Sequence, residues 1–229
     1  MKISIIIPVY NEQERILETI DRVATAPFPP DKEIIVIDDG STDGTATRLA
    51  SVTHPSVIIV TQPHNRGKGA ALRAGFVRAT GDIFLIQNAD LEYSTTDYPA
   101  MLMPIIDGKA DVVYGSRFPG NGVRRDKYYW HFLCTRLLTV SSNTTTGLNL
   151  SDITVGYKVF RHEIINRLQL VENRFGFDPE VTAKIAKLKC RICEVPISYS
   201  RRTYKEGKKI GWKDGISTLR CIIRYGFFD

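Results

Sequence analysis

The sequence lacks an apolar run long enough to cross a bilayer, which takes about 20 residues in a helix. The longest candidate, residues 128–138, is interrupted by His131 and Arg136. The opening segment MKISIIIPVYNEQE is not a signal peptide, because its short apolar run leads directly into polar residues without a small-residue cleavage site. We therefore expect no membrane span, while attachment to a membrane surface stays open.

Cysteine is also scarce, and no low-complexity tract or internal repeat is present. Among the four cysteines, Cys190 and Cys193 form a CxxC pair, but no second ligand pair accompanies it as a structural zinc site requires. We interpret them as buried thiols of a reduced, cytoplasmic protein. No linker rich in Gly, Pro or Ser divides the 229 residues, so we expect one domain.

Positive charge is in excess and gathers at one end. Residues 200–229 hold eight Lys/Arg and three Asp/Glu, so they contribute +5 of the net +6. From about residue 211, Trp212, Ile216, Leu219, Ile223 and Phe227 recur at helical spacing, with Lys213, Arg220 and Arg224 on other faces. A basic amphipathic helix suits a membrane interface, and packing of its apolar stripe on a sheet explains the pattern equally well. Nucleic acid is the least favoured anionic partner, because no recognised binding motif is present.

Short β-branched runs alternate with helix-like stretches along the chain. Expected strands cover 3–10, 33–39, 57–62, 82–88, 110–116 and 191–199. Expected helices cover 12–24, a stretch ending at 49, 68–79, 98–106, 127–145, 178–188 and the tail from 211. Residues 151–160 have a mixed pattern. The alternation predicts an α/β fold with a mainly parallel sheet flanked by helices.

Ligands of such sheets bind beyond the carboxyl ends of the strands. This rule selects four segments: 8–12, 38–39, 88–92 and 115–117. Three of the four carry carboxylates, which the edge of a sheet does not need for stability. The rule therefore predicts a ligand site assembled from these segments.

Two adjacent acids, Asp38 and Asp39, stand between a strand and a turn. Ser41 or Thr42 as a helix cap explains the turn but not the paired acids, so we expect one acid to bind a base or ribose. The glycine-rich segment 65–69 precedes the next helix and offers a weaker anion site that includes Lys68.

The segment QNADLE ends the fourth strand. Strand alternation points Asn88 and Asp90 the same way, and Glu92 as well if the chain stays extended. Mg²⁺ and Mn²⁺ need only one or two carboxylates when substrate phosphates complete the coordination. Asp90 and Glu92 thus form a predicted metal site, with an acidic capping loop as the alternative.

Eight segments resemble one known family in their order and spacing. They are VYNE, VIDDGSTDGT, NRGKGAALRAG, QNADLEY, YGSRF, GYKVFR, NRFGFDPE and EVPISYSRR. Each is modest evidence alone, but together they are similar to family 2 glycosyltransferases of the GT-A fold, in particular the dolichyl- or polyprenyl-phosphate mannosyltransferase-like group. The resemblance covers nearly the whole chain.

This resemblance implies an inverting hexosyltransferase that uses GDP-mannose or UDP-glucose as donor and a dolichyl or undecaprenyl phosphate as acceptor. It implies a Mg²⁺ or Mn²⁺ cofactor and peripheral contact with the cytoplasmic face of a membrane. Residues 1–118 become a nucleotide-sugar-binding half, and residues 119–229 an acceptor-binding half.

Most of the implied roles fall on residues that the strand-end rule also selects; Lys68, Arg136, Lys158 and Arg202 come from the resemblance or the glycine-rich segment instead. The donor is assigned to Pro8, Tyr10, Glu12, Asp38, Asp39, Lys68, Asn88 and Asp90. The metal is assigned to Asp90 and Glu92, and the catalytic roles to Asp90 and Arg117. The acceptor phosphate is assigned to Arg117, Arg136, Lys158 and Arg202.

One position departs from the family pattern. Asn88 stands where the family usually has the first acid of Asp-x-Asp, which removes a negative charge beside the cation. Each tenfold loss of metal affinity corresponds to about 1.4 kcal/mol. We favour a tolerated variation, with an inactive nucleotide-binding homologue as the alternative. The second alternative is a glycosyltransferase with a soluble saccharide acceptor. Such an enzyme needs a general base, which the sequence does not reveal.

Overall fold

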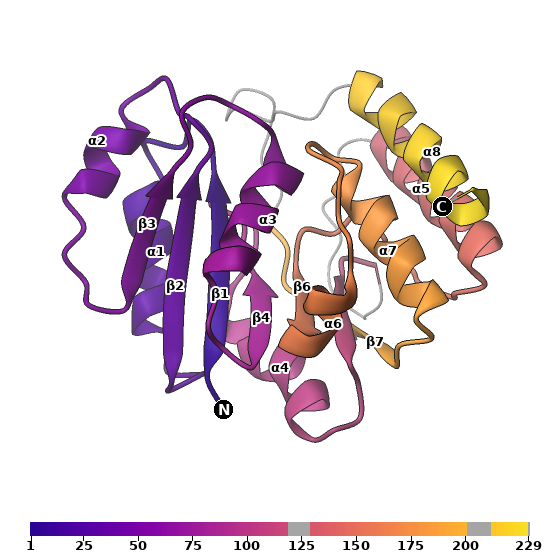
Figure 1. The fold of residues 1–229 in the computed structure, drawn as a ribbon, viewed down its shortest axis with the longest axis horizontal. Helices are drawn as coiled ribbons and strands as arrows, with labels where there is room; N and C mark the ends of the chain where they lie inside the picture. Colours follow the sequence, from indigo (N-terminus) through magenta and orange to yellow (C-terminus); the bar gives the residue numbers. More distant parts are fainter. Residues whose placement is uncertain (119–128, 201–211, 229) are drawn as a thin grey trace.

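The computed structural model describes residues 1–118, 129–200 and 212–228, excluding the side chains of 129–131 and 212–213 (Figure 1). The strands are β1 (Ile3–Val9), β2 (Lys32–Asp38), β3 (Val57–Thr61), β4 (Ile83–Ile86), β5 (Val112–Ser116), β6 (Lys158–Arg161) and β7 (Ile192–Pro196). The helices are α1 (Ile16–Thr25), α2 (Thr45–Ala50), α3 (Lys68–Arg78), the 3₁₀ turn η1 (Thr95–Asp97), α4 (Tyr98–Ile106), α5 (Tyr129–Thr146), α6 (His162–Arg167), α7 (Phe177–Lys187) and α8 (Trp212–Phe227).

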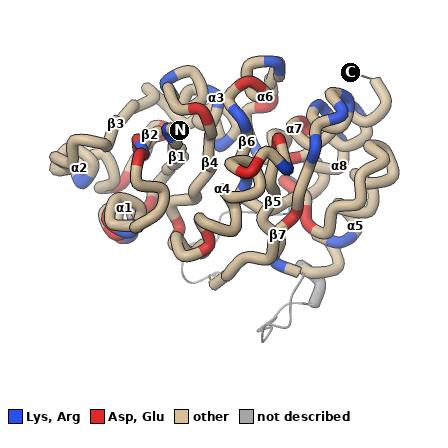
Figure 2. The backbone as a smooth tube through the Cα atoms, turned by 90° about the horizontal axis from the view of Figure 1, so that it is seen from below, with Lys and Arg blue, Asp and Glu red and all other residues tan. Residues whose placement is uncertain are grey.

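The strands form one sheet in the order β3-β2-β1-β4-β6-β5-β7. Parallel pairing joins β3, β2, β1 and β4, and α1 and α3 lie on opposite faces of this part (Figures 1 and 2). Because both faces are covered, the central strands are almost continuously buried and rich in isoleucine and valine. The predicted α/β class with a mainly parallel, helix-flanked sheet is confirmed.

The region with a mixed pattern contains the strand that sequence reasoning missed. β6 lies between β4 and β5 and pairs antiparallel with both. It has four residues and begins with the fully buried Lys158, so neither apolar alternation nor length marks it as a strand. Its pairing also places β4 and β5 parallel to each other, so their carboxyl ends lie at the same edge as those of β1 and β2.

The tail helix α8 does not pack its predicted apolar stripe on the sheet. α8 lies beside α5 and α7 and buries Thr218, Cys221, Ile222 and Tyr225 (Figure 1). The predicted apolar stripe at Ile216, Leu219, Ile223 and Phe227 is 38–66% exposed. Packing of this stripe on the sheet is therefore wrong, because another face of the helix makes the contacts.

Three smaller expectations also have an outcome. α2 begins at Thr45 with Gly44 at its N-cap position and no side-chain cap hydrogen bond, so neither Ser41 nor Thr42 caps it; the Ser41 hydroxyl instead accepts a hydrogen bond from the backbone amide of Asn11 at 2.9 Å. Cys190 and Cys193 are partly buried and pack against the main core. Across the described parts of the chain, no helix has the length and hydropathy of a membrane span.

Candidate functional site

A cavity of about 390 Å³ lies at the carboxyl ends of β1, β2, β4 and β5. This volume falls in the range of small-molecule sites. Nine predicted site residues line it: Pro8, Tyr10, Glu12, Asp39, Lys68, Asn88, Asp90, Glu92 and Arg117. The structure therefore brings together residues from all four segments that the strand-end rule selected.

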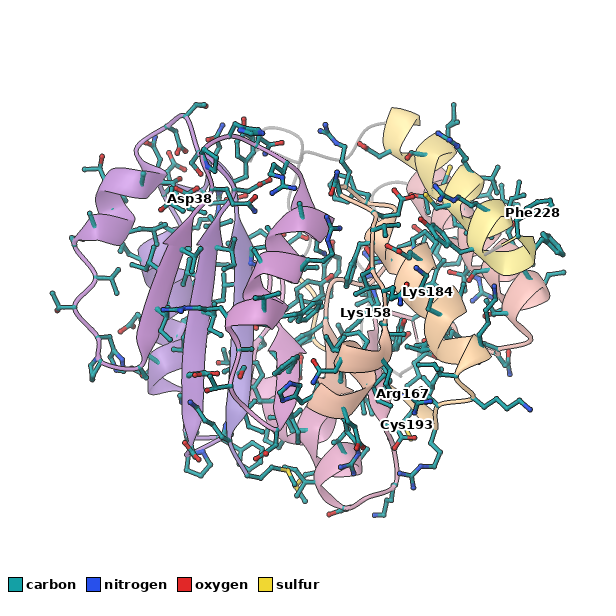
Figure 3. All side chains as sticks on the ribbon, in the orientation of Figure 1. Asp38, Lys158, Arg167, Lys184, Cys193 and Phe228 are labelled. Atoms are coloured by element: carbon teal, nitrogen blue, oxygen red, sulfur yellow. The ribbon has the colours of Figure 1, made fainter. Side chains whose placement is uncertain are left out.

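The two adjacent acids after β2 have different surroundings. Asp39 lines the cavity, and its carboxylate accepts hydrogen bonds from the backbone amides of Arg66 (2.9 Å) and Gly67 (2.7 Å). Asp38 is fully buried at the strand end (Figure 3), where Oδ1 accepts from the Ser41 amide at 3.0 Å. Its Oδ2 has no hydrogen-bond partner among the described residues. Asp39 thus anchors the glycine-rich segment, while Asp38 does not line the cavity.

The glycine-rich segment 65–69 makes a contact within the protein. A Cβ at Gly69 would lie 2.2 Å from the Glu172 carbonyl oxygen, and a Cβ at Gly67 2.5 Å from that of Asn173. The Asn173 carbonyl also accepts a hydrogen bond from the Ala70 amide at 3.0 Å, in the first turn of α3. The glycines therefore admit the protein's own chain, and that chain occupies part of the helix terminus on which the anion interpretation depended.

The acidic segment after β4 does not stay extended. β4 ends at Ile86, residues 89–90 form a turn and Leu91 has a φ of 58°, so strand alternation does not set the directions of Asn88, Asp90 and Glu92. The turn nevertheless brings Glu92 to the cavity wall, and the Glu92 amide donates to Asp90 Oδ1 at 3.3 Å. The predicted location of Glu92 is therefore right for a different geometric reason.

The side chains around Asp90 fit a divalent cation that is also held by substrate phosphates. Asn88 Oδ1 is buried at the cavity without a hydrogen-bond partner among the described residues. Together with Asp90 and Glu92 it supplies the oxygen donors that Mg²⁺ prefers. Within the described ranges, no group of three or more His, Cys, Asp or Glu is arranged for a metal. A cation at Asp90 would therefore need further ligands, which substrate phosphates can supply.

Arg117 is held in one orientation from the second half of the chain. Its Nε and Nη2 donate to the two oxygens of Asp152 at 2.6 and 2.9 Å, and Nη2 also donates to Thr154 Oγ1 at 2.7 Å. Burial disfavours both charges, but their attraction outweighs it, so the pKa of Arg117 is raised and that of Asp152 is lowered. The result is a fixed, permanently charged guanidinium at the cavity wall.

Two tyrosines that sequence reasoning missed pack beside this arginine. The Arg117 guanidinium carbon lies 5.2 Å from the centre of the Tyr199 ring, and the Tyr93 and Tyr199 ring centres are 5.5 Å apart. The Tyr199 hydroxyl donates to Glu92 Oε2 at 3.1 Å. Burial and then the Glu92 charge raise the pKa of Tyr199 to about 12, so it remains a hydrogen-bond donor at neutral pH. Tyr93 and Tyr199 stand in the motifs DLEY and ISYS, and this was the sequence signal that could have placed them at the site.

Two of the predicted phosphate ligands, Lys158 and Arg136, do not line the cavity. Lys158 is fully buried (Figure 3), where it donates to Asp178 and to the carbonyls of Ile153 and Val155. Its assignment to the acceptor phosphate is wrong, because the ammonium group is enclosed by protein partners. Arg136 is exposed on α5 and absent from the cavity wall. Arg202 lies outside the described residues.

The second half contributes further charged side chains that the sequence did not single out. Arg174 lies on the segment that contacts the glycines, Asp178 in the first turn of α7 and Asp214 in the first turn of α8. Arg174 and Asp178 belong to the segment NRFGFDPE, which carried the resemblance and was the available signal for both. Asp214 is on α8, which packs on α5 and α7, and no local pattern marks its place at the cavity.

Comparisons with known proteins agree with this geometry. Residues 4–169 match the family model described as glycosyl transferase family 2. The chain is 32% identical to the undecaprenyl-phosphate mannosyltransferase of Micrococcus luteus, over 99% of this chain and 94% of that protein. It is 29% identical to the dolichol-phosphate mannosyltransferase of Pyrococcus furiosus, over 98% of this chain and 63% of that protein.

A solved structure shows the same fold. Glucosyl-3-phosphoglycerate synthase from Mycobacterium tuberculosis, in complex with Mn²⁺, uridine-diphosphate and phosphoglyceric acid, aligns with a TM-score of 0.76 at 19% identity. The alignment covers 100% of this chain and 79% of that one. At this identity the likeness extends to the architecture of the sheet and its helices.

Proposed function

Since this chain belongs to glycosyl transferase family 2 and is a glycosyltransferase, we propose that it moves a hexose from a nucleotide-sugar to a polyprenyl phosphate. Mannose from GDP-mannose is the preferred donor, with glucose from UDP-glucose second. One observation carries the proposal: a single cavity combines the acidic segment at Asp90 with an arginine held by a buried carboxylate, Arg117. The names of the relatives in Micrococcus and Pyrococcus support the choice of acceptor.

The donor is assigned to the side of the cavity formed by residues 1–118. Pro8, Tyr10, Glu12 and Asp39 line this side, and we assign the base and ribose to them. Asp90, Asn88 and Glu92 would hold Mg²⁺ or Mn²⁺ together with the diphosphate. A bound cation would neutralise the charge that develops on the diphosphate leaving group.

Arg117 is assigned to the phosphate of the acceptor. Its Nε and Nη2 are engaged by Asp152 and Thr154, so the guanidinium meets the substrate already oriented, which limits the entropy lost on binding. An acceptor phosphate is ionised at neutral pH, so its oxygen attacks the anomeric carbon without a strong general base. Attack opposite the leaving diphosphate would invert that carbon.

A soluble saccharide acceptor is the second reading of this cavity. It requires a base beside the acceptor hydroxyl, and Asp178 is a carboxylate on the cavity wall. However, Asp178 Oδ1 already accepts a hydrogen bond from the buried ammonium group of Lys158, so this oxygen is not open to an acceptor hydroxyl. The cavity therefore favours a phosphate acceptor.

The proposal is tested with a panel of GDP-mannose, UDP-glucose and UDP-N-acetylglucosamine against a polyprenyl phosphate, with the product identified by mass. We expect a hexosyl-phospholipid with one donor, activity that is lost with a chelator, and recovery with Mn²⁺ or Mg²⁺. Transfer to a free sugar but not to the lipid phosphate would contradict the acceptor assignment.

Asn88→Asp tests the role of the amide. Restoring the negative charge should tighten Mn²⁺ binding about tenfold, which corresponds to about 1.4 kcal/mol, with a smaller effect on turnover at saturating metal. Metal titration of turnover measures both quantities. If wild-type protein is inactive and Asn88→Asp is active, the chain is an inactive homologue and the proposed activity is wrong.

A further inference from the structure

The segment directly after β7 is fastened to the acidic segment after β4. Tyr199 forms an isolated antiparallel bridge with Tyr93. The next residue, Ser200, donates its backbone amide to the Glu92 carbonyl oxygen at 2.9 Å. These backbone contacts bring a residue of the second half, Tyr199, directly beside a carboxylate side chain that we assign to the cation.

A second contact holds the same segment on the other side of Tyr199. The Asp97 carboxylate accepts hydrogen bonds from the Ser198 backbone amide at 2.7 Å and from the Ser198 hydroxyl at 3.2 Å. The chain is therefore held at both neighbours of Tyr199. Because neither contact involves the Tyr199 hydroxyl, that group is not required to hold the segment in place.

The Tyr199 hydroxyl contacts a predicted metal ligand. It donates a hydrogen bond to Glu92 Oε2 at 3.1 Å, and both residues line the cavity. The Glu92 backbone amide donates to Asp90 Oδ1 at 3.3 Å, so the two predicted carboxylate ligands are also linked to each other. Carboxylates that bind a metal are in turn hydrogen-bonded, and these outer partners orient them. The Tyr199 hydroxyl lies where it can do this for Glu92.

The ring of Tyr199 contacts the other charged centre of the cavity. The Arg117 guanidinium carbon lies 5.2 Å from the ring centre, within the range of a cation–π interaction. Asp152 and Thr154 bind the Arg117 nitrogens, and the ring supplies an additional contact. One side chain therefore contacts both the residue assigned to the cation and the residue assigned to the acceptor phosphate.

We propose that Tyr199 is a positioning residue with two separable parts. Its hydroxyl orients the Glu92 carboxylate for the divalent cation, and its ring orients the Arg117 guanidinium for the acceptor phosphate. The inference rests on the proposed function, which assigns these two ligands to Glu92 and Arg117. Loss of the hydroxyl should weaken cation binding, while loss of the ring should also weaken use of the acceptor.

Tyr199→Phe removes the hydroxyl and keeps the ring. The affinity of the full chain for Mn²⁺ in the presence of GDP should fall about tenfold, because the Glu92 carboxylate loses the donor that orients it. Electron paramagnetic resonance of unbound Mn²⁺ measures this affinity without turnover, with UDP as a second probe. The Mn²⁺ concentration for half-maximal transfer should rise by the same factor. Turnover at saturating Mn²⁺ and the KM for a prenyl phosphate should stay close to those of wild type.

Tyr157→Phe is the matched control. The Tyr157 hydroxyl donates to the Ser94 carbonyl oxygen at 3.1 Å, so this variant loses a hydrogen bond of the same length to the segment that follows Glu92. Tyr157 is fully buried and does not line the cavity. We therefore expect its Mn²⁺ affinity to equal that of wild type.

Tyr199→Leu removes the ring as well as the hydroxyl. It should weaken Mn²⁺ binding as Tyr199→Phe does. It should in addition raise the KM for a prenyl phosphate about fivefold, because the contact of the ring with the Arg117 cation is lost. A KM that rises equally in both variants would contradict separate roles for the hydroxyl and the ring.

Three further results would overturn the proposal. The first is a Mn²⁺ affinity of Tyr199→Phe equal to that of wild type. The second is an equal loss in Tyr157→Phe, which would show that any lost hydrogen bond in this segment loosens the site. The third is wild-type protein that binds no Mn²⁺ with either diphosphate, which would refute the metal assignment as well.

The affinity measurement separates this proposal from the proposed function. If wild-type protein binds Mn²⁺ with GDP but transfers no hexose to a prenyl phosphate, the proposed function fails. The comparison of Tyr199→Phe with Tyr157→Phe still decides the role of the hydroxyl, because it requires only Mn²⁺ and GDP.

Discussion

Residues 1–118 and the later described residues, 129–200 and 212–228, build one cavity by different means. The first part contributes mainly residues just beyond consecutive strands, such as Pro8, Asp39 and Asp90. The second part contributes loop residues and first turns of helices, such as Thr154, Arg174 and Asp214. Where the sheet alone places a side chain, its position follows from local sequence. Where a contact with a distant segment places it, local spacing in the sequence does not predict its position.

The two parts meet at the cavity in several contacts, and two of these lie outside the acidic segment after β4. One is the ion pair between Arg117 and the fully buried Asp152. The other is the contact of Gly67 and Gly69 with Glu172 and Asn173, which positions the segment that carries Arg174. Substitutions at these places therefore test how strongly one part depends on the other.

Arg117→Ala should have the largest effect. Turnover should fall about 10²–10³-fold, because a fixed charge at the reacting phosphates is lost. The free energy of unfolding should also fall by about 3–5 kcal/mol, because Asp152 becomes a buried, unpaired carboxylate. Steady-state kinetics and urea unfolding measure the two effects.

Arg191→Ala is the control for this variant. Arg191 also forms a bidentate pair, with Asp111, but it is 58% exposed and does not line the cavity. We expect little change in stability and unchanged turnover, because solvent screens an exposed ion pair. If Arg191→Ala lowered turnover as much as Arg117→Ala does, the loss of turnover in Arg117→Ala could not be assigned to the charge at the cavity.

Gly69→Ala should have the next largest effect. The new methyl group would meet the Glu172 carbonyl oxygen, so the contact between the two parts must open, at a cost of about 1–3 kcal/mol. Donor affinity should fall as well, because Lys68 and Arg174 on either side of the contact both line the cavity. Urea unfolding and calorimetry with the nucleoside diphosphate measure these changes.

Gly215→Ala serves as the matched helix control. Gly215 lies in α8, and its added Cβ would meet nothing within 4 Å. We expect stability to rise by about 0.5–1 kcal/mol, because alanine favours the helix. If Gly69→Ala did not lower the free energy of unfolding relative to Gly215→Ala, the contact between Gly69 and Glu172 would not be needed for stability.

Glu33→Gln should have the smallest effect, confined to the first part. Burial disfavours the Glu33 charge, but hydrogen bonds from Lys2, Ser4 and Thr80 outweigh it and lower its pKa to about 2. The stabilisation is therefore complete above a pH of about 4.5 and is lost as the pH falls toward 2. Replacing the carboxylate should cost about 1–2 kcal/mol at neutral pH.

Urea unfolding at a series of pH values checks this expectation. The difference between wild type and Glu33→Gln should shrink as the pH falls below 4.5, while turnover at neutral pH stays the same, because Glu33 pairs with Ser4 near the opposite end of β1 from the cavity. A constant difference across this range would show that the carboxylate contributes through packing rather than charge.

The fold was largely predictable because apolar runs and helical spacing have a local origin. The β1, β2 and β4 runs and the helices between them follow directly from β-branched content and periodicity. β6 did not, because its place between β4 and β5 depends on pairing with strands far away in sequence. Glycine patterns were also ambiguous, since Gly67 and Gly69 admit a chain segment as readily as a ligand.

The location of the site was more predictable than the partners of individual side chains. Strand-end logic selected Asp39, Asn88 and Asp90, all of which line the cavity. It could not distinguish Asp39 from the buried Asp38, or reveal that Lys158 is enclosed with Asp178. Those outcomes depend on burial and on charges supplied by other segments.

The position of β6 has a consequence for how the chain folds during synthesis. β4 and β5 both precede β6, yet neither completes its pairing until residue 161 has left the ribosome. At about 5–20 residues per second, the buried edge of β4 stays without this partner for several seconds. An unpaired strand edge invites pairing with other chains. We therefore expect residues 1–118 not to fold as an independent module, although they form most of the side of the cavity that is proposed for the donor.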